Sequence, residues 1–172
     1  AISALTDEKY FGGSLDVLRQ IVALDLRLPL LRKDFICDRY QIYESRANGA
    51  DAILLIVAEL SDGDLGAFQS LARDLGLAAL VEAHTRDELG RALACGATLI
   101  GINNRDLRDF TVSLDTARGL RPLIPPGVVV VVESGLKARS DFCDLQVDAA
   151  LIGEAIVKAS DVAGKVRELA GV

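Results

Sequence analysis

The sequence predicts an α/β fold built on a parallel sheet, and two observations support this. Short apolar, β-branched runs recur at intervals of about 20 to 30 residues, and a polar-capped segment with helical spacing follows each run. The chain is 51% hydrophobic but only 5% aromatic, without Trp or Met, so aliphatic side chains must fill the core. Strands made of such aliphatic runs are typical of parallel sheets that are covered on both faces.

Seven apolar runs are the expected strands, and they occupy residues 2–5, 28–31, 52–57, 78–81, 99–102, 128–132 and 149–152. Oxygen side chains mark helix starts between them, because an N-cap oxygen accepts from amides that the helix leaves unpaired. Ser14 precedes an apolar stripe, while Asp38 with Gln41 and Thr85 with Glu88 have capping-box spacing. Further helices are expected to start at Ser61 and to cover 114–120, 138–145 and 155–169.

Seven βα units in order, without a hairpin, favour an incomplete (β/α)8 TIM barrel over an open doubly wound sheet, which is the alternative. The units correspond to strands two to eight of that barrel, in one domain of residues 1–172. A complete barrel takes about 250 residues, so we expect a first βα unit and an N-terminal extension to be missing.

Composition narrows the classes of partner. A net charge of −6 argues against nucleic acid, but local basic groups can still hold a small phosphorylated substrate. Cys37, Cys95 and Cys143 form no CxxC pair and only one His is present, which indicates a reduced cytoplasmic setting and no metal site. No apolar run approaches the roughly 20 residues that span a bilayer, so no membrane contact is expected.

Polar residues at the ends of the expected strands are the candidates for chemistry, because active sites of parallel barrels lie there. Lys33, Glu82 and Glu133 follow apolar runs, and Asn103 ends another. An ammonium and two carboxylates in one apolar mouth are suited to acid–base catalysis.

Structural roles remain open for the same residues. Lys33 would then pair with Asp34, and the two carboxylates would neutralise Arg32 and Arg105. Asn103 would cap the loop that carries Arg105, and His84 is interpreted as a loop residue before the Thr85 helix cap. Gly135 and Gly153 follow the last two runs, where TIM barrels commonly seat a phosphate, although a single glycine is often only a turn residue.

The strand ends together resemble the indole-3-glycerol phosphate synthase family over nearly the whole chain. The most specific blocks are Arg-Lys-Asp-Phe at 32–35 and Asn-Asn-Arg-Asp-Leu at 103–107, supported by Val-Glu-Ser-Gly at 132–135 and Ile-Gly-Glu-Ala at 152–155. The resemblance implies a carboxy-lyase of tryptophan biosynthesis that needs no cofactor. Its substrate, 1-(2-carboxyphenylamino)-1-deoxyribulose 5-phosphate, closes a ring and loses carbon dioxide and water to give indole-3-glycerol phosphate.

The resemblance also implies roles for individual residues. Lys33 would protonate the ribulose carbonyl, Glu82 would serve the later dehydration, and Asn103 and Glu133 would orient these groups. Arg105 and Ser134 would line the site. Phe11, Phe35 and Leu107 would form an apolar cage around the anthranilate ring, and the phosphate would rest on amides near Gly135, Gly153 and Glu154.

The sequence departs from the family pattern in two places. No segment supplies the family's first-strand Glu-x-Lys motif, and residues 136–147 are few, so a curtailed helix is expected there. A chain of this kind is alternatively an inactive barrel fragment that binds phosphate ligands or needs a complementing N-terminal segment, and its open edges would permit self-association. Phosphoribosylanthranilate isomerase would show a strand-end Cys and Asp, and ribulose-phosphate epimerase a metal-binding His set; neither pattern is present.

Overall fold

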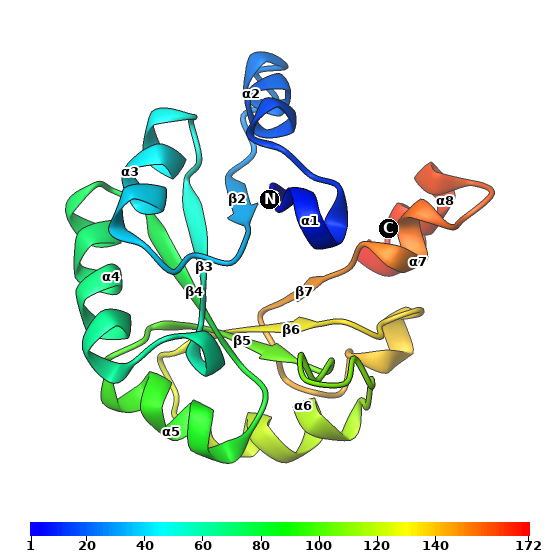
Figure 1. Cartoon of the computed structure of the whole chain (residues 1–172). Coiled ribbons are helices and arrows are strands. Elements are labelled where there is room, and N and C mark those ends of the chain that lie inside the picture. The colour runs from blue at the N-terminus through cyan, green and yellow to red at the C-terminus, as the bar shows by residue number, and fades with distance from the viewer.

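The computed structural model describes residues 1–172, and its seven parallel strands form one sheet in chain order. They are β1 (Ile2–Leu5), β2 (Leu30–Lys33), β3 (Ala52–Ile56), β4 (Ala78–Ala83), β5 (Leu99–Asn103), β6 (Val129–Glu133) and β7 (Ala149–Leu151). The sheet curls with the helices around its outside (Figure 1), and β1 and β7 each pair with a single neighbour. This confirms the incomplete (β/α)8 barrel.

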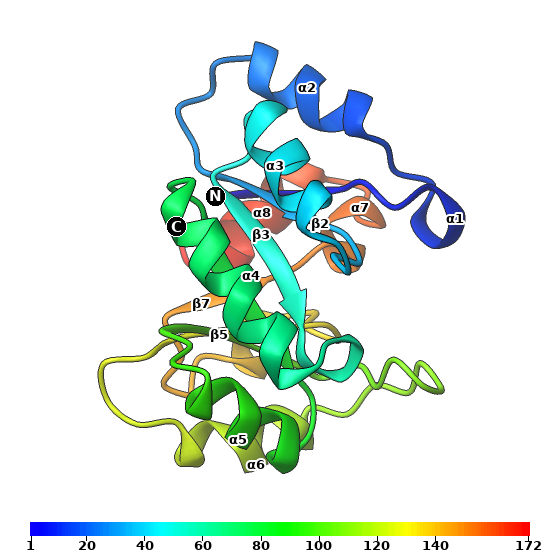
Figure 2. The ribbon, with the colours of Figure 1, turned by 60° about the vertical axis from the view of Figure 1, so that its left-hand side comes forward.

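The helices are α1 (Glu8–Phe11), α2 (Leu15–Ala23), α3 (Arg39–Ala47), α4 (Asp62–Asp74), α5 (Arg86–Ala94), α6 (Asp115–Leu120), α7 (Glu154–Val157) and α8 (Val162–Ala170), with short 3₁₀ turns η1 (Val57–Glu59), η2 (Arg121–Leu123) and η3 (Arg139–Asp141). Side-chain oxygens of Ser14, Asp38, Ser61 and Thr85 cap their helices as predicted. Figure 2 shows from a second side that α3 and α4 lie outside β3. No helix is long and apolar enough to cross a membrane.

Several expected bounds were wrong. The second strand begins at Leu30 instead of residue 28, since Pro29 has no N–H and Leu28 is left exposed. The expected helix over 155–169 divides into α7 and α8, because Asp161 caps a new helix by accepting from the Gly164 amide. Of the helix expected over 138–145 only the turn η3 forms, which agrees with the shortness of this segment.

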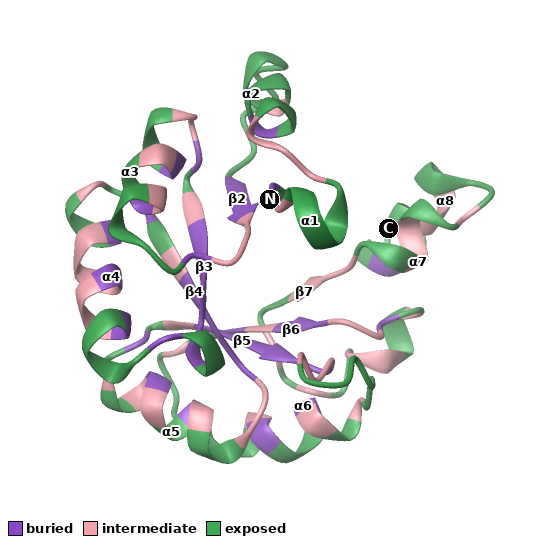
Figure 3. Cartoon of the chain, in the orientation of Figure 1, coloured by how far each residue is buried: buried purple, intermediate pink, exposed green.

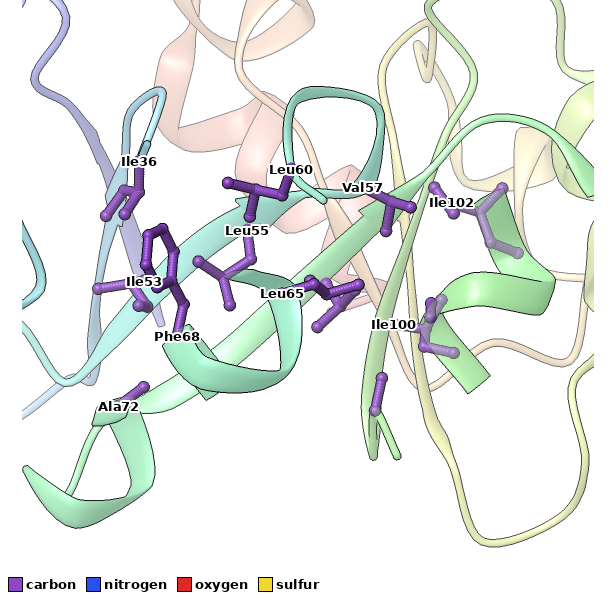
Figure 4. Close-up of a cluster of buried hydrophobic side chains, with 14 of the residues drawn as sticks. Ile36, Ile53, Leu55, Val57, Leu60, Leu65, Phe68, Ala72, Ile100 and Ile102 are labelled. Atoms are coloured by element: carbon purple, nitrogen blue, oxygen red, sulfur yellow. The ribbon is translucent and has the colours of Figure 1, made fainter. Parts of the chain in front are cut away.

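Alternating strand residues are buried on opposite faces of the sheet. Ile53 and Leu55 of β3 pack outward against Leu65 and Phe68 of α4 (Figure 4). Facing inward, a separate cluster fills the barrel interior and consists of Leu31, Leu54, Ile56 and Leu80. Figure 3 shows buried residues in the central strands, inside helices whose outer faces are exposed, whereas β7 has no buried residue. Burial on both faces explains the continuous apolar runs, and each buried Leu or Ile stabilises the fold by about 1.5–3 kcal/mol.

Candidate active site

The inward face of the sheet changes from apolar to polar toward the carboxyl ends of the strands. Lys33 lies two residues beyond Leu31, and Glu82 lies two residues beyond Leu80, so each shares the inward face of that leucine. The same spacing relates Glu133 to Val131, which packs against the inner cluster. The apolar interior therefore ends in a layer of charged groups.

Three strands bring these charged groups into contact. Lys33 Nζ lies 2.8 Å from Glu133 Oε2 and 3.4 Å from Glu82 Oε2. Asn103 Nδ2 donates to Glu82 Oε1 at 2.8 Å. The two carboxylate side chains are 1% and 4% exposed, whereas that of Lys33 is 22% exposed. The four predicted catalytic residues thus form one hydrogen-bonded group, and its ammonium is the member that solvent reaches best.

The purely structural ion pairs considered for Lys33, Glu82 and Glu133 do not form as expected. Asp34 pairs with Arg32 at 2.9 Å and not with Lys33. Arg32 also pairs with Glu44 and donates to Ser45 of α3, so it neutralises neither Glu82 nor Glu133. The reason is strand alternation, which turns Arg32 to the helix side of the sheet. Asn103 does cap the loop that carries Arg105, since its Oδ1 accepts from the Arg105 amide.

Burial and charge shift two ionisation equilibria in this group. Burial raises the pKa of Glu133 to about 7, although the Lys33 ammonium opposes the shift. Burial by itself would lower the pKa of Lys33, but the attraction of Glu133 and Glu82 outweighs it and the pKa is raised. Glu133 Oε1 is buried without a hydrogen-bond partner. Lys33 is therefore a charged proton donor held between two acids.

An apolar-walled cavity of about 100 Å³ opens beside these charged groups. All three predicted cage residues, Phe11, Phe35 and Leu107, line it, together with Lys33, Glu82, Asn103, Arg105 and Ser134. Phe11 stacks on Phe35 with ring centroids 6.4 Å apart, and Tyr10 meets Phe35 edge-on at 5.9 Å. These contacts place an aromatic wall on one side of the cavity. Asp7 and Asp34 also line it, and the sequence did not single them out as site residues.

A second hollow of about 420 Å³ lies at the ends of β6 and β7. Its lining includes Ser134, Gly135, Gly153 and Glu154 together with four basic residues, namely Arg105, Lys137, Lys158 and Lys165. Glu154 is the single carboxylate, and it pairs with Lys158 at 2.6 Å and with Arg105 at 3.8 Å. Arg105 and Ser134 line both hollows. A positively charged hollow thus adjoins the apolar cavity in an acidic protein.

The two glycines at this hollow differ in why they fit. Gly135 has φ +76°, and a Cβ there would lie 2.5 Å from Val112 Cγ1, so a side chain is excluded by conformation and by space. Gly153 has no such constraint, since nothing lies within 4 Å of its Cβ position. The three lysines of the hollow were missed, because Lys158 and Lys165 lie on a segment expected to be one plain helix.

His84 is the loop residue that was expected, but it also supports the site. Its Nδ1 lies 2.7 Å from the carbonyl oxygen of Asn103, and its Nε2 lies 3.7 Å from Asp106. The ring therefore ties the end of β4 to the loop after β5. No group of three or more His, Cys, Asp or Glu side chains is arranged to hold a metal ion.

Comparison with known proteins agrees with the family resemblance of the sequence. The model of the indole-3-glycerol phosphate synthase family matches residues 1–169. The chain belongs to this family. An indole-3-glycerol phosphate synthase of Dehalococcoides mccartyi is 54% identical over 98% of the chain and 67% of its own length, and one of Roseiflexus castenholzii is 54% identical over 99% and 67%. The chain thus spans about two thirds of these indole-3-glycerol phosphate synthases.

Solved structures outside the indole-3-glycerol phosphate synthase family show the same fold. A 3-keto-L-gulonate-6-phosphate decarboxylase of Vibrio cholerae has a TM-score of 0.74 at 14% identity and covers 98% of this chain and 83% of its own. KGPDC of Streptococcus mutans has a TM-score of 0.75 at 16% identity, with 98% and 84% covered. At such low identity these likenesses concern the barrel alone.

Proposed function

We propose that this chain catalyses the synthase reaction of its family, with Lys33 as the general acid. The observation that carries the proposal is the position of the Lys33 ammonium, which lies 2.8 Å from Glu133 and 3.4 Å from Glu82 beside an aromatic-walled cavity. A charged donor in an apolar site acts more strongly than in water, because the dielectric constant is low.

The reaction uses these groups in two stages. The anthranilate ring carbon attacks the ribulose carbonyl carbon, and the carbonyl oxygen takes the Lys33 proton to become a hydroxyl. Carbon dioxide leaves and its bonding electrons restore the aromatic ring. Glu82 then takes a proton from the carbon next to the hydroxyl-bearing carbon and passes it to the hydroxyl, which departs as water. Lys33 regains its proton from solvent. Glu133 and Asn103 hold Lys33 and Glu82 in place.

The two hollows suit the two ends of the substrate. The anthranilate ring fits the cavity with Phe11, Phe35 and Leu107, and the phosphate fits the basic hollow at Gly135, Gly153 and Glu154. Arg105 and Ser134, which line both, would contact the ribulose portion between them.

We further propose a cytoplasmic location and no resident cofactor, and we expect no partner other than copies of the chain, which associate through the open sheet edges.

Substitution of Lys33 tests the role of the general acid. Lys33→Ala is expected to lower turnover of the ribulose phosphate substrate by about 10²- to 10⁴-fold, the usual contribution of such a group, while circular dichroism shows a folded chain. Lys33→Arg keeps the charge but holds its protons too firmly, so it should also be slow. Arg73→Ala, an exposed cation on α4, is the control and should leave turnover unchanged. Near-normal turnover of Lys33→Ala would contradict the assignment.

A second candidate, a phosphate-binding chain without turnover, is favoured by the unpaired edges of β1 and β7. Calorimetric binding and turnover of the substrate, measured on one sample, separate the two functions. The second candidate would be supported if the chain alone binds the substrate without turnover, and turnover appears when a peptide carrying the first βα unit of a family relative is added. Turnover by the chain alone would exclude it.

A further inference from the structure

Gly101 lies in the middle of β5, where the barrel interior becomes polar. A Cβ at this position would lie 2.3 Å from Glu133 Oε1 and 3.4 Å from Leu80 Cδ1, so it would point inward. The residue is not in the left-handed region of backbone conformation, and its strand pairs in regular register with Glu82 and Val131. The backbone therefore does not require glycine here, and the reason for glycine has to be space.

We propose that Gly101 is a positioning residue: the space left by its missing side chain holds the Glu133 carboxylate, which in turn fixes the Lys33 ammonium. The inference rests on the proposed function only in treating Lys33 as the general acid. The space that Gly101 leaves for the Glu133 carboxylate does not depend on the reaction.

The register of β5 and β6 shows how Glu133 uses this space. Glu133 pairs with Asn103, whereas Gly101 pairs with Val131, one inward-facing layer deeper in the barrel. The Glu133 carboxylate nevertheless reaches the Gly101 layer, and its Oε1 is buried there without a hydrogen-bond partner. A carboxylate oxygen leaves water at a cost unless a strong interaction holds it, and the 2.8 Å contact of Oε2 with Lys33 is that interaction.

A methyl group at residue 101 would break this arrangement. Ordinary contacts of a Cβ begin at 3.4 Å, so the carboxylate would have to retreat by about 1 Å. Because the added methyl group would lie in the deeper layer of Gly101 and Val131, we expect the retreat to be toward the mouth of the barrel. Lys33 would then lose its 2.8 Å partner and keep only Glu82 at 3.4 Å.

Gly101→Ala in the full chain tests the proposal, with Gly90→Ala on α5 as the matched control because nothing lies within 4 Å of that Cβ position. A displacement of about 1 Å in a catalytic group costs up to 10²-fold, so we expect kcat to fall at least tenfold with little change in KM. Gly90→Ala should keep both constants. Wild-type kinetics in Gly101→Ala would overturn the proposal.

Glu133→Asp provides a rescue, since a side chain shorter by one methylene clears the added methyl group. Gly101→Ala/Glu133→Asp should be several-fold more active than Gly101→Ala, although Glu133→Asp alone lowers activity. Simple multiplication of the two single effects would contradict the shared space.

Two readouts do not depend on turnover. Carbon-13 NMR of the Glu133 carboxyl should show its titration moving away from the wild-type pH in Gly101→Ala, because both its burial and its contact with Lys33 change, and staying in place in Gly90→Ala. If Gly101→Ala folds poorly, it should be tolerated in a Glu133→Ala background, because the obstructing carboxylate is gone. Equal destabilisation in both backgrounds would refute the proposal. If the parent chain has no turnover but the Glu133 titration moves in Gly101→Ala, the role of Gly101 in placing the carboxylate is upheld and the proposed function is refuted.

Discussion

At the scale of single residues, Glu133 joins complete burial to a close ion pair. Burial makes its ionised form costly, and Lys33 makes it tolerable. The ionised and neutral forms of Glu133 are therefore close in free energy near neutral pH, so proton transfer among substrate, ammonium and carboxylates needs little rearrangement. Strongly perturbed pKa values cluster at catalytic sites, and structural ion-pair networks also produce them.

This balance predicts a pH dependence of stability. The folded state holds the Glu133 proton up to about pH 7, whereas the unfolded chain releases it near 4.5, so the folded state binds more protons between these values. The free energy of unfolding should therefore fall as pH rises through this window, by an amount on the order of 3 kcal/mol from this group. The raised pKa of Lys33 contributes stability that is lost only at alkaline pH, above 10.5.

Glu133→Gln removes the titrating group and should flatten this part of the stability profile. Urea unfolding between pH 4.5 and 7 measures the change, and Glu59→Gln, which alters an exposed carboxylate, should retain the slope. An unchanged slope in Glu133→Gln would show that the carboxyl ionises normally in the folded protein.

At the scale of elements, capping chemistry connects helix starts to the site. Thr85 Oγ1 accepts from the Glu88 amide at 3.2 Å, and Glu88 Oε2 accepts from the His84 amide at 2.7 Å. His84 in turn contacts the Asn103 carbonyl oxygen. The first turn of α5 therefore holds His84, whose ring connects the end of β4 to the end of β5.

Loss of this cap should weaken the fold more than the chemistry. Thr85→Ala is expected to lower the free energy of unfolding by about 1 kcal/mol, because an amide at the helix start loses its acceptor, and Thr85→Ser should recover most of it. Chemical denaturation at a constant m-value gives both numbers. Equal stability of Thr85→Ala and the parent chain would mean that water replaces the cap without cost.

At the scale of the whole molecule, the open sheet leaves two unpaired edges. The amides of Ile2 and Thr6 donate to carbonyl oxygens next to or in β2, so alternation turns those of Ser3 and Leu5 away from β2, toward the open side. Free edge amides are templates for pairing with another chain.

Ser3→Pro should therefore reduce concentration-dependent association without removing a bond between β1 and β2, because proline deletes an outward amide. Sedimentation velocity over a range of protein concentrations measures the effect, and Ser3→Ala, which keeps the amide, is the control. Association that is equal in both variants would place the contact elsewhere on the molecule.

The sequence by itself determined the seven strands in order, the caps at Asp38 and Thr85, and the polar strand ends that identify the family. These features depend on neighbours within a few residues, so the local sequence is enough to predict them. The division of the expected helix into α7 and α8 was not predicted, because the cap at Asp161 interrupts an otherwise continuous helical pattern of apolar residues.

Only the tertiary structure decided which charges meet. Lys33 and Asp34 are neighbours in sequence, yet strand alternation and barrel curvature pair Lys33 with Glu133 and turn Asp34 toward Arg32. The lysines of the second hollow and the space at Gly101 likewise arise from contacts between distant segments. The physical reason is that ion pairing and packing depend on distances through space, which the register of neighbouring strands sets and local sequence does not.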